Sequence, residues 1–304
     1  MNAVYVANHK PKYNYLCDIR EMVKKAKAKE LPEQLYNLDI LDGSPPCSSF
    51  SVSGNREKDW GKEKHFREGQ SAQILDTLFF DFIELVKELK PKVVIAENVK
   101  GLLLGDAKEY AKRVIKDFDD AGYYVVYTLL NASTMGVPQK RERVFFTCIR
   151  KDISQGLLVP DGLFDVKPNI NMQFNEKPIK LKDFADYKGQ KISDGVLKYW
   201  EQKNDNDNNI GDVVKRLENR TSMFDLNLVR SNNVCNTIAA RVWQNIYFDK
   251  PYYLGEHDVK LASTFPQDYN FLDQSVHYIC GMSVPPVMMA QISSRVYDFW
   301  LSKI

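Results

Sequence analysis

Two hydrophobic patterns alternate along the first half of the chain. Between short strand-like runs, apolar residues recur three or four positions apart, as in amphipathic helices over residues 20–30, 71–90 and 107–118. The β-branched or aromatic runs themselves, typical of buried strands, occupy residues 4–8, 15–19, 39–43, 93–98, 123–130 and 144–149. Strand and helix in alternation predict an α/β fold with a mostly parallel, doubly wound sheet that helices cover on both faces.

The pattern changes after residue 150. Residues 151–232 are rich in Asn, Asp and Lys and show only weak periodicity. Regular patterns then return, with strands predicted at residues 236–240 and 245–248 and a closing helix at 285–304 that has proline in its first turn. We therefore expect a main domain over residues 1–150, a small region over 151–232, and a return to the main domain over 233–304.

Composition and charge exclude several classes of protein. The 42 basic and 40 acidic side chains leave a formal charge of +2, so no overall field attracts nucleic acid. Five cysteines and four histidines lack the spacing of a disulfide framework or a zinc site. That spacing leads us to expect no metal. Because neither a signal peptide nor a membrane-length apolar run is found, we expect a cytoplasmic protein.

Chemically useful side chains follow two of the predicted strands. Cys47 comes after the strand at 39–43 and a proline pair, and Glu97 and Asn98 end the strand at 93–98. Ligands of an open parallel sheet bind at the carboxyl ends of its strands, which favours a site there. Taken singly, a cysteine in this position is ordinarily a buried small hydrophobe, and a Glu-Asn pair a cap or a turn.

A third feature is the basic segment QKRER, residues 139–143, directly before the strand at 144–149. Arg141 and Arg143 are two positions apart, so in an extended segment they point to the same side. The segment is either a solvated strand entrance or the third part of one site.

The three features resemble the DNA cytosine-5 methyltransferases. PPCSSFS resembles the family's nucleophile loop, ENVKG its carboxylate motif, QKRERVFF its arginine motif, NTIAA its threonine-containing strand and GMSVPP its final motif. The motifs occur in family order, and the likeness spans about residues 4–150 and 233–304. The resemblance implies the S-adenosylmethionine-dependent methyltransferase fold, with residues 151–232 as a small target-recognition region.

The resemblance also assigns a reaction. Cys47 would attack carbon 6 of cytosine, so that carbon 5 can accept a methyl group from S-adenosylmethionine, which leaves as S-adenosylhomocysteine. Glu97 would hold ring N3 and the amino group, Arg143 the ring carbonyl, and Arg141 would order the active-site loop. A base inside duplex DNA cannot present carbon 6, so the target must be flipped out.

Other residues carry over as binding residues. Near the DNA we expect Ser49, Ser51, Asn98, Gln139 and Thr237, with Asn98 fixing a turn rather than touching the base. Near the methyl donor we expect Asn8, His9, Asp18, Ile19, Pro46, Leu78 and Val284.

The sequence departs from the family in places. The family's first strand and Gly-rich turn are not found, and residues 4–8 resemble its second strand, here followed by His9 in place of an acidic residue. Because the first strand lies in the middle of this fold's sheet, we expect an upstream segment or a second chain to fill its place. Ser48, Met282 and Asn232 stand where the family usually has Gln, Asn and Arg.

Three functions remain open from the sequence. The first is a DNA cytosine-5 methyltransferase of the bacterial or phage modification type, as found in restriction-modification systems. The second is a catalytically silent relative that binds DNA or a partner, and the third is an RNA cytosine-5 methyltransferase on the same scaffold.

Overall fold

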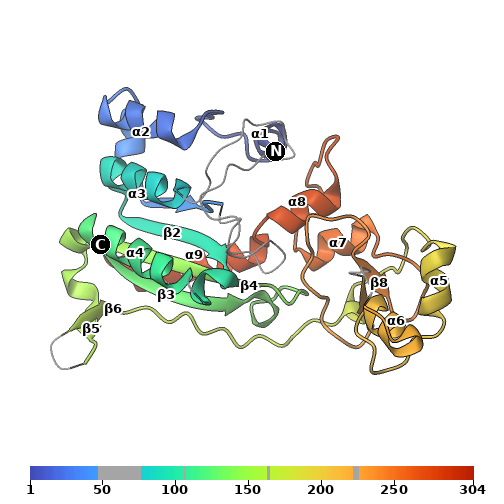
Figure 1. The fold of residues 1–304 in the computed structure, drawn as a ribbon. Coiled ribbons are helices and arrows are strands. Elements are labelled where there is room, and N and C mark those ends of the chain that lie inside the picture. The colour runs from blue at the N-terminus through green and yellow to red at the C-terminus, as the bar shows by residue number, and fades with distance from the viewer. Residues whose placement is uncertain (47–76, 106, 163–164, 222–225) are drawn as a thin grey trace. The chain divides into compact units, whose positions relative to one another are not determined.

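The computed structural model describes residues 1–46, 77–105, 107–162, 165–221 and 226–304. Its contacts divide the chain into two compact units (Figure 1). One, the sheet unit, comprises Tyr15–Leu130, Glu142–Met172 and Ser293–Ile304. The other, the second unit, comprises Met1–Asn14, Asn131–Arg141 and Gln173–Ile292. The division of the chain by function, expected at residues 150 and 232, remains a prediction.

A four-stranded sheet organises the sheet unit. Its strands lie in the order β1 (Ile40–Gly43), β2 (Val93–Val99), β4 (Glu142–Arg150) and β3 (Tyr123–Asn131). β1 runs parallel to β2, whereas β2 runs antiparallel to β4. The α/β class is confirmed, and the described strand pairings make the sheet mixed. β3 is followed by only the short 3-10 helix Ala132–Thr134 before β4, so no helical crossover joins these two strands.

Helices α3 (Leu78–Leu89) and α4 (Ala107–Asp120) share an apolar core with this sheet, through the stripes that the sequence predicts. α2 (Ile19–Lys27) packs mainly against α3. The closing helix α9 (Pro286–Phe299) begins in the second unit and ends in the sheet unit. Phe79 of α3 lies 5.7 Å from the Phe146 ring of β4 in an edge arrangement, and both are buried. Burial of each such ring contributes about 1.5 to 3 kcal/mol relative to leaving it exposed. A small hairpin of β5 (Leu158–Pro160) and β6 (Val166–Pro168) completes the sheet unit.

The second unit is built from short elements. They are α1 (Asn2–His9), α5 (Asp194–Trp200), α6 (Ile210–Glu218), β7 (Asn227–Val229), β8 (Asn245–Tyr247), α7 (Glu256–Ala262) and α8 (Val276–Met282). β7 and β8 pair in parallel. The remaining regular segments of both units are short 3-10 helices at Glu33–Tyr36, Lys100–Leu103, Lys151–Ile153, Gln155–Leu157, Leu181–Asp183 and Leu301–Lys303.

Three predicted strands are wrong. Residues 4–8 lie within the helix α1, residues 15–18 are irregular before α2 begins at Ile19, and residues 236–239 are irregular. A strand needs a neighbour that accepts its backbone hydrogen bonds, whereas a helix satisfies them internally. α1 does so and also buries Val4 in the apolar core of the second unit. Residues 15–18 contain the aromatic Tyr15 and the apolar Leu16, but no strand pairs with them among the described residues.

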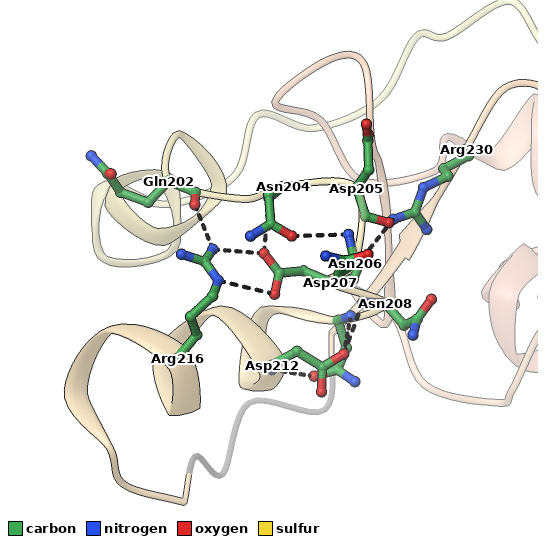
Figure 2. Close-up of polar contacts among 10 residues, drawn as sticks. Gln202, Asn204, Asp205, Asn206, Asp207, Asn208, Asp212, Arg216 and Arg230 are labelled. Atoms are coloured by element: carbon green, nitrogen blue, oxygen red, sulfur yellow. Dashed lines mark hydrogen bonds and ion pairs between the residues drawn. The ribbon is translucent and has the colours of Figure 1, made fainter.

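An ion pair orders the Asn- and Asp-rich tract of the second unit (Figure 2). Arg216 Nη2 lies 2.7 Å from Asp207 Oδ2 and also donates to the Gln202 carbonyl at 2.7 Å. Arg230 Nη2 donates to the carbonyls of Asp205 and Asp207, each at 2.8 Å. Burial, the largest single effect, raises the pKa of Asp207, but the hydrogen bonds from Arg216 and the Asn204 N–H and the charges of Arg216 and Arg230 together lower it. Polar and charged contacts thus order this tract, while the Ile210 side chain packs into an apolar core of the second unit.

No helix among the described residues combines the length and the apolar character needed to cross a bilayer.

Candidate active site

Glu97 and Arg143 meet because of the register between β2 and β4. Val99 is the direct partner of Arg143, and Glu97 lies two positions before Val99 on the same face of β2. The two side chains are therefore diagonal neighbours, and Arg143 Nε lies 2.8 Å from Glu97 Oε1. Their side chains are only 17% and 10% exposed, so the pair is largely shielded from water.

The end of β1 adds a hydroxyl group to this pair. Gly43 is the partner of Ala96 in the parallel ladder, so the next residue, Ser44, lies beside Glu97. Ser44 Oγ donates a hydrogen bond to Glu97 Oε2. A Cβ on Gly43 would lie 2.5 Å from the Phe82 ring, so only glycine lets α3 pack this closely against the strand end.

Asn98 makes hydrogen bonds at the turn next to the pair. Its Nδ2 donates to the Pro45 carbonyl at 3.2 Å, and its Oδ1 accepts a hydrogen bond from the Val99 N–H at 2.8 Å. Asn98 is 3% exposed. The amide therefore ties the end of β2 to the segment that follows β1.

The surroundings of Arg143 leave its guanidinium charged. Burial lowers the pKa of Arg143, and the neighbouring Glu97 opposes that effect. A guanidinium has a normal pKa far above neutrality, so Arg143 remains a cation. A fixed hydrogen-bond acceptor thus lies beside a fixed donor, the complement of a ring that carries an amino group or N–H next to a carbonyl.

The predicted nucleophile lies outside the described residues. Cys47, Ser49 and Ser51 follow Pro46, the last residue described before residue 77. Among the other cysteines, burial raises the pKa of Cys235 and of Cys280 to about 12 and raises that of Cys148 as well. Such thiols are poor nucleophiles because the reactive form is the thiolate.

Gln139, Arg141 and Thr237 lie together in the second unit. Gln139 is fully buried, and its Oε1 accepts a hydrogen bond from the Ile238 N–H at 3.0 Å. Thr237 Oγ1 donates to the Lys140 carbonyl. Arg141 is 2% exposed and donates to the carbonyls of Ile238 and Gly281 at 3.1 and 3.0 Å. Residues 236–240 were predicted to be a strand bonded to a neighbouring strand. Hydrogen bonds involving these three side chains hold the segment instead.

Three of the residues predicted to hold the methyl donor lie in the second unit. His9 and Val284 line a cavity of about 520 Å³. Asn8 does not line it, but its Nδ2 donates to the Asn270 carbonyl at 2.8 Å and its Oδ1 accepts from the Asn270 N–H at 2.7 Å. The remaining lining is mostly apolar or aromatic: Met1, Asn2, Val4, Tyr5, Phe265, Pro266, Tyr269, Ile279, Ser283 and Pro286.

The other four lie in the sheet unit. Asp18 caps α2, accepting a hydrogen bond from the Arg20 N–H at 2.8 Å, and Ile19 is the first residue of that helix. Leu78 begins α3 and is 8% exposed, and Pro46 follows the segment that Asn98 holds. Their predicted contacts with a donor stay predictions.

The sequence motifs did not single out two residues that the structure places at these sites. Ser44 is bonded to Glu97, although a lone serine after a strand carries no signal. Gly281 leaves no room for a side chain, because a Cβ there would lie 2.2 Å from the backbone of Ala239 and Ala240. The glycine that opens GMSVPP was the available clue.

Together, the α/β fold and a buried acceptor–donor pair, at the end of β2 and the start of β4, define an α/β protein with a candidate site whose polar groups complement a planar polar ring. The family model for the C-5 cytosine-specific DNA methylase matches residues 1–298. The chain belongs to this family.

The chain is also similar in sequence to individual methyltransferases. The chain is 37% identical over 150 residues to Type II methyltransferase M.FnuDI of Fusobacterium nucleatum, which is 49% of this chain and 38% of that protein. It is 32% identical over 187 residues to Orphan methyltransferase M.Rho11sI of Bacillus phage rho11s, covering 60% of this chain and 34% of that protein. The matches thus span well under half the length of these relatives.

The fold is also similar to a solved structure. The Dnmt2 methyltransferase of S. pombe aligns over 98% of this chain and 87% of its own, with a TM-score of 0.60 and 12% sequence identity. At that identity the likeness concerns the fold, and it confirms the predicted methyltransferase fold class.

Proposed function

We propose that this chain transfers a methyl group from S-adenosylmethionine to carbon 5 of a cytosine flipped out of double-stranded DNA. The observation that carries the proposal is the Glu97–Arg143 pair, held at 2.8 Å by the β2–β4 register and bonded to Ser44. Family membership supplies the reaction class.

The pair complements the polar edge of cytosine. Glu97 accepts hydrogen bonds from the exocyclic amino group and from a protonated N3, while Arg143 donates to the ring carbonyl. Holding N3 in its protonated form withdraws electrons from the ring and favours addition at carbon 6. Ser44 keeps the carboxylate oriented before the base arrives, because its hydroxyl already occupies one carboxylate oxygen.

The covalent steps involve Cys47. Its thiolate adds to carbon 6, and the electron pair of the 5,6 double bond moves to carbon 5, which becomes nucleophilic. S-adenosylmethionine supplies the methyl group that carbon 5 takes up. A base then removes the proton from carbon 5, the double bond re-forms, and the Cys47 thiolate leaves. Arg141, bonded to two backbone carbonyls, acts as a positioning residue in this scheme.

The adenosyl end of the donor is proposed to bind in the cavity of the second unit. The volume of about 520 Å³ and the aromatic lining suit a purine ring, with the His9 and Tyr5 rings 4.8 Å apart and tilted by 33° at its wall. Val284 and Ser283 would contact the same group. For Asp18, Ile19, Pro46 and Leu78 of the sheet unit, contact with the donor stays a prediction from the family resemblance.

The proposal is tested with DNA that contains 5-fluorocytosine, made by copying a random-sequence template. Fluorine at carbon 5 cannot leave as a proton does, so after methyl transfer the chain should stay attached to the DNA through denaturing electrophoresis. Matched DNA with ordinary cytosine should give no lasting adduct. An adduct on fluorinated transfer RNA but not on DNA would overturn the DNA substrate, and an adduct on neither would favour a silent relative.

We also propose that a further strand, from an upstream segment or a second chain, pairs with the outer edge of β1. Among the described residues β1 pairs only with β2, and residues 4–8 form α1 instead of a neighbouring strand. The outer backbone groups of β1 are therefore available to a strand.

Calorimetric titration tests this second proposal. We expect S-adenosylmethionine to bind the 304-residue chain weakly, with a dissociation constant above about 100 μM, because a strand at that edge would bring further donor contacts. S-adenosylhomocysteine serves as the matched ligand without the transferable methyl group. Binding at about 1 μM by the chain alone would contradict the need for a further strand.

A further inference from the structure

Residues 241–243 form an exposed turn of unusual composition in the second unit. Val242 is 39% exposed and Trp243 is 41% exposed, and Arg241 beside them is exposed as well. Trp243 has a φ of 66°, in the left-handed region that favours glycine. A bulky residue persists in that conformation only where its surroundings hold it there. The turn thus keeps a large aromatic ring at the surface despite backbone strain.

The segment that leads into the turn is rigidly held. Ile238 is bonded through its N–H to Gln139 and through its carbonyl to Arg141, at 3.0 and 3.1 Å. Ala239 and Ala240 press against Gly281, where a Cβ would lie 2.2 Å from their backbone. Arg141 also donates to the Gly281 carbonyl at 3.0 Å, which fixes both sides of this contact.

Aromatic neighbours support the Trp243 ring. Its centroid lies 5.0 Å from that of Tyr253 at an angle of 51°, and 6.4 Å from that of His277. Burial lowers the pKa of His277, so this imidazole is neutral at pH 7 and does not place a cation under the indole. The ring is therefore restrained by two neighbouring rings, while Trp243 as a whole remains 41% exposed.

We propose that the turn Arg241–Val242–Trp243 binds DNA and that the Trp243 ring inserts between two neighbouring base pairs of the duplex. This inference rests on the proposed function, because that function supplies DNA as the partner. Insertion partly unstacks the two base pairs, and the contacts between the ring and the bases offset that cost. A ring already fixed at the surface loses little side-chain freedom on binding. Arg241 places a cation beside it for the phosphate backbone. Ile238, three residues before the turn, is bonded to Gln139 and Arg141.

Three substitutions of Trp243 distinguish a loss of base stacking from a loss of folding stability. Trp243→Ala should weaken binding to a random-sequence duplex about 10-fold, since one base–aromatic stack is worth that much. Trp243→Phe keeps a ring and should stay within about 3-fold of the unchanged protein. Trp243→Gly should bind as weakly as Trp243→Ala while its unfolding temperature is kept or raised, because glycine relieves the left-handed strain.

Leu272→Gly is the matched control. Leu272 is likewise a large apolar residue with a positive φ, 50°, and is 48% exposed, in the same unit. This variant relieves similar strain and should leave DNA affinity unchanged.

The readout is fluorescence anisotropy of labelled duplex, with tryptophan emission recorded in parallel. Stacking on a base should quench the emission of the unchanged protein, and Trp243→Phe should lose most of that quenching while binding is retained. Equal affinities of Trp243→Ala and the unchanged protein would overturn the inference, as would undiminished quenching in Trp243→Phe. The adduct assay with 5-fluorocytosine DNA is scored separately, so failure of methyl transfer is distinguishable from failure of the turn to bind.

Discussion

Replacing Glu97 by glutamine is expected to lower the rate of methyl transfer about 1,000-fold. Glutamine has nearly the same shape but carries no charge, so it cannot stabilise a protonated N3, and its amide group would meet the cytosine amino group with a second donor. DNA affinity should change little, because Glu97 is 8% exposed and only a flipped base would reach it. Single-turnover transfer of a tritiated methyl group, with protein and donor in excess over DNA, measures the rate.

A neighbouring ion pair provides the control for Glu97. Glu142 lies in β4 and pairs with Lys100 at 2.9 Å, but its side chain is 41% exposed. Glu142→Gln breaks an ion pair of the same kind and should leave the rate within about 2-fold. Cys47→Ala should reduce transfer to background, which sets the lower limit of the assay. A rate for Glu97→Gln within 10-fold of the unchanged protein would contradict the proposed role.

The addition of Cys47 to cytosine, the step before methyl transfer, can be followed without the donor. Reversible addition of Cys47 to carbon 6 makes the hydrogen at carbon 5 exchangeable, so DNA with tritium at that position should release it to water. Glu97→Gln should slow this release as strongly as it slows methyl transfer. The assay therefore reports on Glu97 even when the donor binds weakly.

Replacing Asp258 by alanine is expected to destabilise the second unit by about 4 kcal/mol. The Asp258 carboxylate is fully buried and accepts hydrogen bonds from the Asp186 N–H at 3.0 Å, the Tyr187 N–H at 3.3 Å and the Tyr247 hydroxyl at 2.7 Å. His257 Nδ1 lies 2.9 Å from the same carboxylate. Alanine would leave several donors without an acceptor, and each buried unsatisfied group costs about 1 to 3 kcal/mol.

Urea unfolding, followed by far-ultraviolet circular dichroism, measures this loss. Asp258→Asn keeps one acceptor oxygen and should cost about half as much. Asp268→Asn, an exposed acid in the same unit, should change stability by less than about 0.5 kcal/mol. If Asp258→Ala unfolded at the same urea concentration as the unchanged protein, the network would have no structural role.

Much of the fold was predictable from local patterns. The helix at 71–90 and the strands at 93–98 and 144–149 correspond to α3, β2 and β4, because each pattern reflects a face that must be buried. The strand at 4–8 failed for a physical reason. A β-branched run forms a strand only where it pairs with another strand, and residues 4–8 instead satisfy their backbone hydrogen bonds within α1.

The candidate site was predictable in its residue types and less so in its contacts. Glu97 and Arg143 were identified from their motifs, since contiguous residues with special chemistry leave a readable signature. Arg141 illustrates the limit, because spacing placed it on the same side as Arg143, yet it bonds to carbonyls of the second unit. Its partners, Ile238 and Gly281, are remote in sequence, and no local pattern encodes them.

The sequence by itself determined the family of this protein, the order of its motifs and the identity of the residues proposed for its chemistry. These properties depend on neighbouring residues, which the chain order states directly. Only the tertiary structure decided that Ser44 bonds to Glu97, that residues 4–8 become a helix, and that Trp243 is held at the surface in a left-handed conformation. Each of these depends on hydrogen-bond partners or packing contacts supplied by segments far away in the sequence.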